Sequence, residues 1–325
     1  MRHLAGDVVK SASRPLRVSI ARARLRWSTR KVGVALVYHR VAEREGLEEE
    51  LLARHDPELF GEHMEHLRVH YRVVPASELV RAAASRRRGE RIPAAVTFDD
   101  DLESHLDTAA PILRRHGLTA TFFLCGASLE RPYWFWWERY EAACEAGMAP
   151  SEIAGAPGWP SNAAPPATMR AGAEVVQRLD LGARSQLEEW LRTRAGDDPD
   201  GSGLRAKAVR TLRDAGFEIG FHTLRHPYLP VLDDDGLTEA MAAGRDALAA
   251  VAGTDLTTVA YPHGGCDARV AAAARRAGFE YAFTLEPTPA TPDGEPLLIG
   301  RLETFESRSR FAMQVVRTLE SDGQR

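Results

Sequence analysis

The chain has 325 residues, of which 44% are hydrophobic, so it is long enough for one large globular domain or two small ones. A formal net charge of −4 and a pI near 6.3 give no reason to expect a nucleic-acid partner. Three scattered cysteines without CxxC spacing argue against a disulfide framework or a cysteine-rich zinc cluster, and they agree with a reducing compartment.

Residues 1–31 form a basic leader. Nine of them are Lys or Arg, and Asp7 is the single acidic residue. Apolar residues alternate with the basic ones, which predicts either a disordered or loosely helical segment or an amphipathic segment that rests on an anionic membrane surface. No apolar run reaches the length of a signal-peptide core or a transmembrane helix, so we expect a cytoplasmic protein, with peripheral membrane contact through this leader as the alternative to a disordered leader.

Strand and helix signals alternate after the leader. The expected strands are 32–38, 71–74, 94–98, 119–124, 217–221, 257–261, 281–285 and 297–302. The expected helices are 57–70, 77–85, 106–116, 203–215, 237–251 and 268–277. Repeated βα units of this length predict an α/β fold with a parallel sheet, either doubly wound or closed as a barrel.

The alternation is interrupted at 130–203, which we interpret as a helical and irregular insertion in a domain that spans 32–305. An aromatic cluster at 133–137 leads a helix to about residue 146, and a polar helix is expected over 169–194. We interpret the aromatic residues as a packing patch, with a sugar-stacking platform as the alternative. Residues 306–325 are expected to form a C-terminal helix or tail.

Polar side chains follow several of the expected strands, at the point where each strand ends. They are His39, Asp99, Asp100, His222, His263, Arg301 and Glu303. Because the carboxyl ends of parallel strands meet at one edge of a sheet or barrel, we expect these side chains to form a single site.

One carboxylate and two imidazoles of this set can hold a divalent metal. Asp100 closes one strand, and His222 and His226 follow another strand about 120 residues later. Zinc is the expected ion for this donor set, although cobalt, nickel, iron or manganese would suit it as well. Asp99 is then free to act as a base toward water whose pKa the metal lowers. The alternative is a capped turn beside a histidine pair that binds no metal.

These segments resemble the motifs of the NodB-type polysaccharide deacetylases, carbohydrate esterase family 4. Residues 97–100 (TFDD) are similar to the first family motif, 222–227 (HTLRHP) to the second and 260–264 (AYPHG) to the third. The resemblance covers about residues 33–305, apart from the insertion. It implies a distorted (β/α) barrel of about seven parallel strands.

The resemblance also implies roles for individual residues. It makes Asp99 the catalytic base and makes Asp100, His222 and His226 the ligands of the metal. The backbone amide of His263 is implied in the oxyanion hole. Tyr261, in the same turn, is expected beside the substrate.

Two positions near the site depart from the family pattern. Asp101 stands where the family has glycine, which places a further side chain, and another negative charge, beside the site. Ala260 replaces the arginine that opens the third motif, and we expect Arg301 to orient the base in its place.

The general acid is a third departure, since no histidine follows His263. Residues 38–41 (YHRV) resemble an early YH motif found in a subset similar to poly-N-acetylglucosamine deacetylases. We therefore assign His39 as the general acid, with His263 as the alternative, because an imidazole suits proton donation near neutral pH.

The predicted function is metal-dependent removal of an N-acetyl group from an amino sugar of a cell-envelope glycan or its precursor, which could be lipid-linked or nucleotide-linked. A deformylase or an O-deacetylase on the same scaffold is an alternative. A non-catalytic carbohydrate-binding protein and a structural protein that acts through the aromatic insertion are others. Binding alone does not require a base together with three metal ligands, which argues against the last two.

Overall fold

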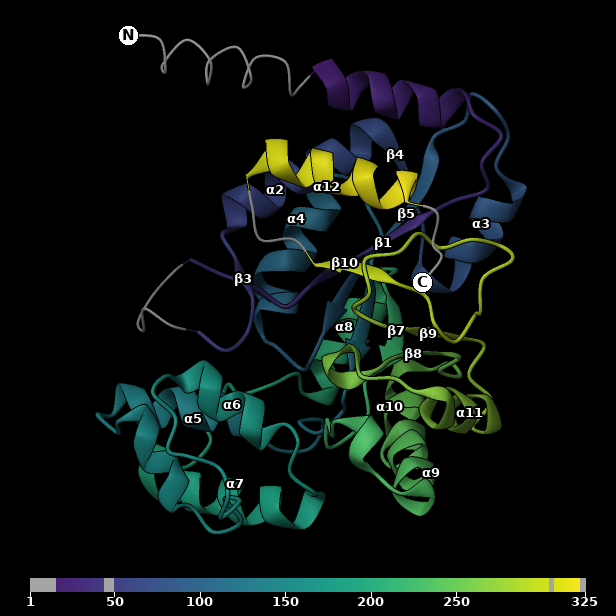
Figure 1. Cartoon of the computed structure of the whole chain (residues 1–325). Helices are drawn as coiled ribbons and strands as arrows, with labels where there is room; N and C mark the ends of the chain where they lie inside the picture. The colour runs from purple at the N-terminus through teal and green to yellow at the C-terminus, as the bar shows by residue number, and fades with distance from the viewer. Residues whose placement is uncertain (1–15, 44–49, 304–306, 322–325) are drawn as a thin grey trace, which may run out of the picture.

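The computed structural model describes residues 16–43, 50–303 and 307–321. Its centre is a parallel sheet with the strand order β10-β1-β5-β6-β7-β8-β9, and β4 pairs with the first half of β5 (Figure 1). These strands are β1 (Val34–Tyr38), β4 (Tyr71–Val73), β5 (Ile92–Asp99), β6 (Thr121–Leu124), β7 (Glu218–Phe221), β8 (Thr258–Ala260), β9 (Tyr281–Phe283) and β10 (Arg301–Glu303). An isolated parallel bridge between Phe283 and Ile299 brings the two ends of the sheet together. The result is a nearly closed barrel, which confirms the predicted distorted (β/α) barrel of seven strands.

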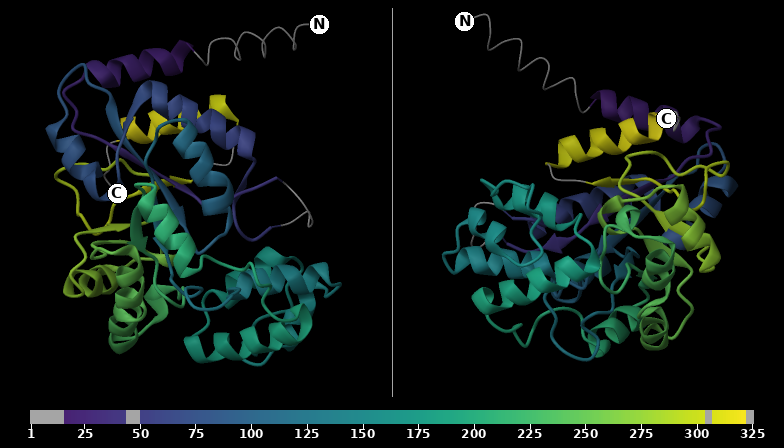
Figure 2. Two further views of the ribbon diagram at one scale, coloured as in Figure 1. Left: turned by 180° about the vertical axis from the view of Figure 1, so that it is seen from behind. Right: turned by 60° about the horizontal axis from the view of Figure 1, so that its bottom comes forward.

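Helices surround the barrel on its outer side (Figure 2). They are α2 (Pro57–His70), α3 (Leu79–Ser85), α4 (Ala110–Arg115) after a π-helical turn at His105–Ala109, α8 (Ala206–Asp214), α9 (Asp234–Ala242), α10 (Arg245–Ala252), α11 (Ala268–Arg276) and α12 (Arg308–Glu320). Residues 16–27 form a further helix, which lies beside α2 and α12 (Figures 1 and 2). None of the described helices has the length and apolar content needed to cross a membrane.

Alternate residues of each strand face opposite sides of the barrel wall, as a pleated strand requires. On β1, Val34, Leu36 and Tyr38 belong to the large apolar core under the outer helices, whereas Ala35 belongs to a smaller interior cluster. The interior cluster also includes Phe123 and Phe283. A Cβ atom at Gly220 would lie 2.4 Å from the ring of Phe123, so only glycine leaves room for this side chain inside the barrel.

The interrupted segment forms its own helical layer, seen at the lower left of Figure 1. It contains α5 (Trp136–Glu145), α6 (Met169–Val176) and α7 (Leu181–Ala195). These helices share a separate apolar cluster in which Phe135, Trp136 and Trp137 are all buried. Three of the five aromatic residues at 133–137 therefore pack within the protein, as the first of the two interpretations expects. Leu51 and Leu52 also pack against this cluster.

Candidate active site

Backbone strain is concentrated at the carboxyl ends of the strands. Four non-glycine residues in the described part of the chain have φ in the left-handed region, namely Asp100 (74°), Thr223 (57°), His226 (47°) and His263 (56°). All four follow β5, β7 or β8 within five residues, at the edge where the sequence places the site, and Asp100 follows β5 directly. Strained backbone of this kind persists only where the surrounding structure holds it, and it is typical of functional sites.

Asp100, His222 and His226 lie together in this strained region, and all three are buried. The two imidazole Nε2 atoms are 3.1 Å apart. Oδ1 of Asp100 lies 3.6 Å from Nε2 of His222 and 3.4 Å from Nε2 of His226. Ligand atoms of a tetrahedral zinc ion, each about 2.0–2.1 Å from the metal, are about 3.3 Å apart. The three atoms therefore have the spacing of a metal-binding face.

The hydrogen bonds around the triad also suit a metal. Nδ1 of His222 lies 2.8 Å from the carbonyl oxygen of Ala260, so this nitrogen carries the proton and Nε2 keeps its lone pair. Oδ1 of Asp100 is buried without a hydrogen-bond donor. Burial raises the pKa of Asp100 well above its usual range, and the Asp99 carboxylate raises it further. A cation bound to all three atoms would satisfy this oxygen and stabilise its charge.

The two histidines have the protonation state that metal binding needs. Burial lowers the pKa of His222 and lowers that of His226 well below its usual value. Both imidazoles are therefore neutral at pH 7, which is the form that binds a metal ion.

Asp99, the predicted base, is held by Arg301, the residue that is predicted to orient it. Oδ1 of Asp99 accepts a hydrogen bond from Nη1 of Arg301 at 2.6 Å, and Oδ2 accepts one from Nη2 at 2.7 Å. Arg301 is fully buried, and its Nη1 and Nε also donate to Thr97 Oγ1 and to the Thr284 carbonyl. Burial by itself would raise the pKa of Asp99, but the guanidinium of Arg301, with a smaller effect of His222, lowers it to about 2. Asp99 is therefore ionised.

The two candidates for the general acid have different neighbours in the site. His39 directly follows β1, which pairs with β5, and its Nδ1 is buried without a partner. Burial lowers its pKa to about 4, while the Asp99 carboxylate acts in the opposite direction. The His263 ring lies 4.5 Å from the His226 ring, and burial lowers its pKa to about 3 with no comparable effect of Asp99.

Tyr261 lies apart from these groups. Its side chain is fully buried in the core, and its hydroxyl donates a hydrogen bond to the carbonyl of Leu297 at 3.1 Å. We therefore leave Tyr261 out of the residues proposed to contact substrate. The turn in which it lies still brings His263 to the site.

Asp101 has a structural position that the sequence did not reveal. Its Oδ1 accepts hydrogen bonds from the backbone N–H groups of Cys125 and Gly126, and Oδ2 accepts from Ala127 N–H and Ser128 Oγ. The carboxylate thus ties the end of β5 to the loop after β6. The side chain lies beside the site, as the sequence indicates, and four donors occupy its oxygens.

The insertion contributes a wall of the site, which sequence reasoning missed. Trp137 packs edge-on against His226, with ring centroids 4.7 Å apart. Arg184 of α7 is buried and donates from Nη1 to the carbonyl of His226 at 2.9 Å and from Nη2 to the carbonyl of Arg225. Arg184 therefore holds the backbone of His226 in its left-handed conformation.

We expect Arg184→Met to weaken zinc binding by about 10- to 100-fold, as loss of groups that orient a metal ligand typically does. The reason is that the carbonyl groups of Arg225 and His226 would each lose a hydrogen bond beside the strained backbone of His226. Zinc affinity is measured by competition with a chromophoric chelator. The control is Arg192→Met on the same helix, where the side chain is 45% exposed. Equal affinities of both variants and the unaltered protein would contradict this role.

A parallel barrel whose strand ends bring together a carboxylate–histidine–histidine triad and an ionised, arginine-bound carboxylate has the groups of a hydrolase that works through a general base. The family model described as polysaccharide deacetylase matches residues 86–282, and the chain belongs to this family. The protein is thus a carbohydrate deacetylase, a hydrolase that acts on carbon–nitrogen bonds.

Solved structures support the same fold. The Streptococcus pyogenes deacetylase PplD in complex with acetate is 17% identical with a TM-score of 0.59, and the match covers 89% of this chain and 99% of that one. IcaB from Ammonifex degensii is 18% identical with a TM-score of 0.57, over 89% and 97% of the two chains. A de-N-acetylase from Aggregatibacter actinomycetemcomitans is 15% identical with a TM-score of 0.55, over 85% and 95%. No curated protein matches the sequence.

Proposed function

We propose that the protein removes the N-acetyl group from an amino sugar of a cell-envelope glycan or its precursor, in a metal-dependent reaction. The observation that carries the proposal is the ionised Asp99 beside the Asp100, His222 and His226 triad. The structural neighbours support it, since one is named a de-N-acetylase and another was solved with acetate, which hydrolysis of an N-acetyl group releases.

Asp100, His222 and His226 would hold the metal, and we propose zinc because one carboxylate and two neutral imidazoles suit this ion. When bound, such an ion acts as a Lewis acid and lowers the pKa of water. Asp99 accepts the proton of the attacking water, and Arg301 keeps both oxygens of this carboxylate in place. The backbone N–H of His263 is proposed to stabilise the negative charge that develops on the amide oxygen.

His39 is the proposed donor of a proton to the departing amine. It is neutral at pH 7, so the proton that it passes to the amine is the one that Asp99 accepts from the attacking water. The negative charge of the Asp99 carboxylate favours the protonated form of His39, and it has no comparable effect on His263. This difference supports His39 rather than His263 as the proton donor. This assignment agrees with the proposed kinship to the subset with an early YH motif.

The test of this function is acetate release by the purified protein, with a chelator and with added zinc. The substrates are chitooligosaccharides and lipid-linked or nucleotide-linked N-acetylhexosamines. We expect acetate that disappears with the chelator and returns with zinc. Formate from N-formylated sugars, or acetate from O-acetylated sugars alone, would instead identify a deformylase or an O-deacetylase. A protein that neither binds zinc nor loses activity with the chelator would contradict metal dependence.

We further propose the setting in which the enzyme acts. Residues 32–305, with the insertion 130–203, are the proposed catalytic unit. Three scattered cysteines without CxxC spacing support a reducing, cytoplasmic location, and the basic residues of the N-terminal segment support contact with a membrane. A lipid-linked or nucleotide-linked precursor fits this setting better than a finished cell-wall polymer.

A further inference from the structure

Exposed apolar side chains gather at one place on the surface. In the described part of the chain, six large apolar residues are strongly exposed, and four of them lie around the helix 16–27. These four are Leu16 (64% exposed), Ile20 (52%), Trp27 (59%) and Val69 (41%). Trp27 and Val69 line the same cavity, so the helix and the end of α2 present one apolar area. Clustering of this kind is typical of a surface that binds a partner.

The helix 16–27 has three distinct faces. Successive residues are about 100° apart, so Leu16, Ile20 and Trp27 fall within a stripe about 40° wide. Leu25, with Val18 and Ala21, packs against the core on the opposite face. Arginines flank the apolar stripe on both sides, with Arg17 and Arg24 on one side and Arg22 and Arg26 on the other. An apolar stripe between rows of arginine is typical of helices that lie in a membrane interface.

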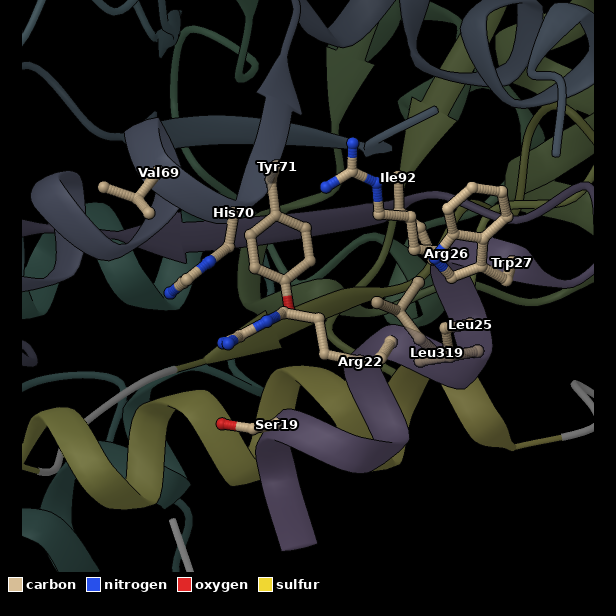
Figure 3. A pocket seen from close by; sticks show the side chains of 11 residues that line it. Ser19, Arg22, Leu25, Arg26, Trp27, Val69, His70, Tyr71, Ile92 and Leu319 are labelled. Atoms are coloured by element: carbon tan, nitrogen blue, oxygen red, sulfur yellow. The ribbon is translucent and has the colours of Figure 1, made fainter. Parts of the chain in front are cut away.

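A cavity of about 240 Å³ lies directly beside this stripe, between the helix, the start of β4 and the start of β5 (Figure 3). Its polar lining consists of Ser19, Arg22, Arg26, His70 and Tyr71, and none of the described residues that line it is acidic. Trp27 and Val69 lie at its two sides in Figure 3. The cavity therefore combines positive charge with an apolar border.

The positive charge of the cavity has no counter-charge in the described part of the protein. Arg22, which is partly buried, makes no hydrogen bond or ion pair among the described residues. The Tyr71 side chain is 2% exposed, and its hydroxyl has no hydrogen-bond partner within residues 16–43, 50–303 and 307–321. Burial, and then Arg22, Arg308 and Arg91, lower the pKa of His70 to about 4. An arginine and a hydroxyl that both lack partners in a half-buried cavity form a site for an anion.

We infer that this face docks on a membrane of anionic phospholipids, with a headgroup phosphate in the cavity and the apolar stripe at the acyl boundary. Charge complementarity supports this partner, since arginines border the stripe on both sides and line the cavity. A soluble phosphate ion would account for the cavity, but it would not account for the exposed apolar side chains of Leu16 and Ile20. The inference deepens the membrane contact in the proposed function and is independent of the reaction itself.

The experiment is co-sedimentation of the full chain with vesicles of phosphatidylglycerol and phosphatidylcholine, compared with vesicles of phosphatidylcholine alone. We expect binding to the anionic vesicles that weakens with added salt. Ile20→Asp should weaken it about tenfold, because it places a charge in the apolar stripe. Arg22→Gln should weaken it about fivefold, as expected for one arginine near an anionic surface. The controls are Leu298→Asp and Arg192→Gln, which alter exposed residues elsewhere.

Thermal unfolding shows that each variant is folded before its binding is compared. Equal binding to both kinds of vesicle, or unchanged binding of Ile20→Asp and Arg22→Gln, would overturn the inference. Binding of inorganic phosphate without binding of vesicles would do so as well, because it would assign the cavity to a soluble anion. Acetate release from a soluble sugar is measured separately, so a failure of the docking surface is distinguishable from a failure of the proposed function.

Discussion

Asp99→Asn is expected to lower kcat for acetate release by about 10³-fold, within the range typical of the loss of a general base. The amide has nearly the size of the carboxylate but cannot accept the proton of water. The ligand atoms of Asp100, His222 and His226 are unchanged, so zinc should stay bound. Steady-state acetate release and the zinc content of the same sample together measure the effect.

Two further variants define the cause of that loss. Asp214→Asn alters a carboxylate that is 65% exposed at the end of α8, outside the candidate site, and it should leave turnover unchanged. Arg301→Met removes both hydrogen bonds to Asp99, and we expect it to reduce kcat while zinc is retained. If Asp99→Asn kept the activity of the unaltered protein, Asp99 would not be the base. If it lost zinc together with activity, Asp99 would belong to the metal site instead.

His222→Ala is expected to abolish both zinc binding and activity. His222 provides one of three ligand atoms, and its imidazole is fixed by a hydrogen bond to Ala260. Only two ligand atoms would remain, on a backbone that is strained at Asp100 and His226. Zinc content and the shift of the unfolding temperature on zinc addition are the measurements, since a ligand that binds only the folded state stabilises it.

The matched control is His116→Ala, a half-buried histidine at the end of α4 that pairs with Glu65. This variant should bind zinc as the unaltered protein does. Unchanged deacetylation by His222→Ala would contradict the assigned metal site. A shift of the unfolding temperature by zinc in His222→Ala would mean that the ion binds elsewhere.

The parts of the fold that depend on short-range patterns were predictable. The helix expected over 57–70 has those bounds in the structure, because Asp56 caps its first turn and Pro57 opens it. The helix expected over 237–251 is instead two helices, α9 and α10, since Gly244 adopts a left-handed φ of 78° between them. The helix expected over 169–194 is also divided, because Asp180 caps a new helix, α7.

Burial of polar residues was harder to predict. The spacing of His63, His66 and His70 on α2 predicts a solvated helix face, and this prediction is wrong for two of the three. His63 and His66 are buried under α12, where the ring of His63 stacks on Phe311 at 4.0 Å. Aromatic stacking stabilises an imidazole in the core as it does a phenyl ring, and periodicity does not distinguish this case from a solvated stripe.

The residues at the centre of the candidate site could be predicted from the positions of the strand ends, but the contacts of the insertion with the site could not. Asp99, Asp100, His39 and His222 could be placed because parallel strands bring their carboxyl ends together. Arg184 lies 42 residues before His226, in a helix where Glu188 at i+4 suggests an ordinary surface pair. Its long-range hydrogen bonds depend on how the insertion packs on the barrel, which no local pattern contains.

The attachment of Arg184 and Trp137 to His226 would link the insertion thermodynamically to a metal ion bound by His226. Any ion that stabilises the observed position of His226 also stabilises the contacts of α5 and α7 with it. By reciprocity, a glycan that holds these helices against the barrel raises the affinity for the ion by the same factor. Substrate and metal are therefore expected to bind cooperatively, although the helices supply no ligand atom of their own.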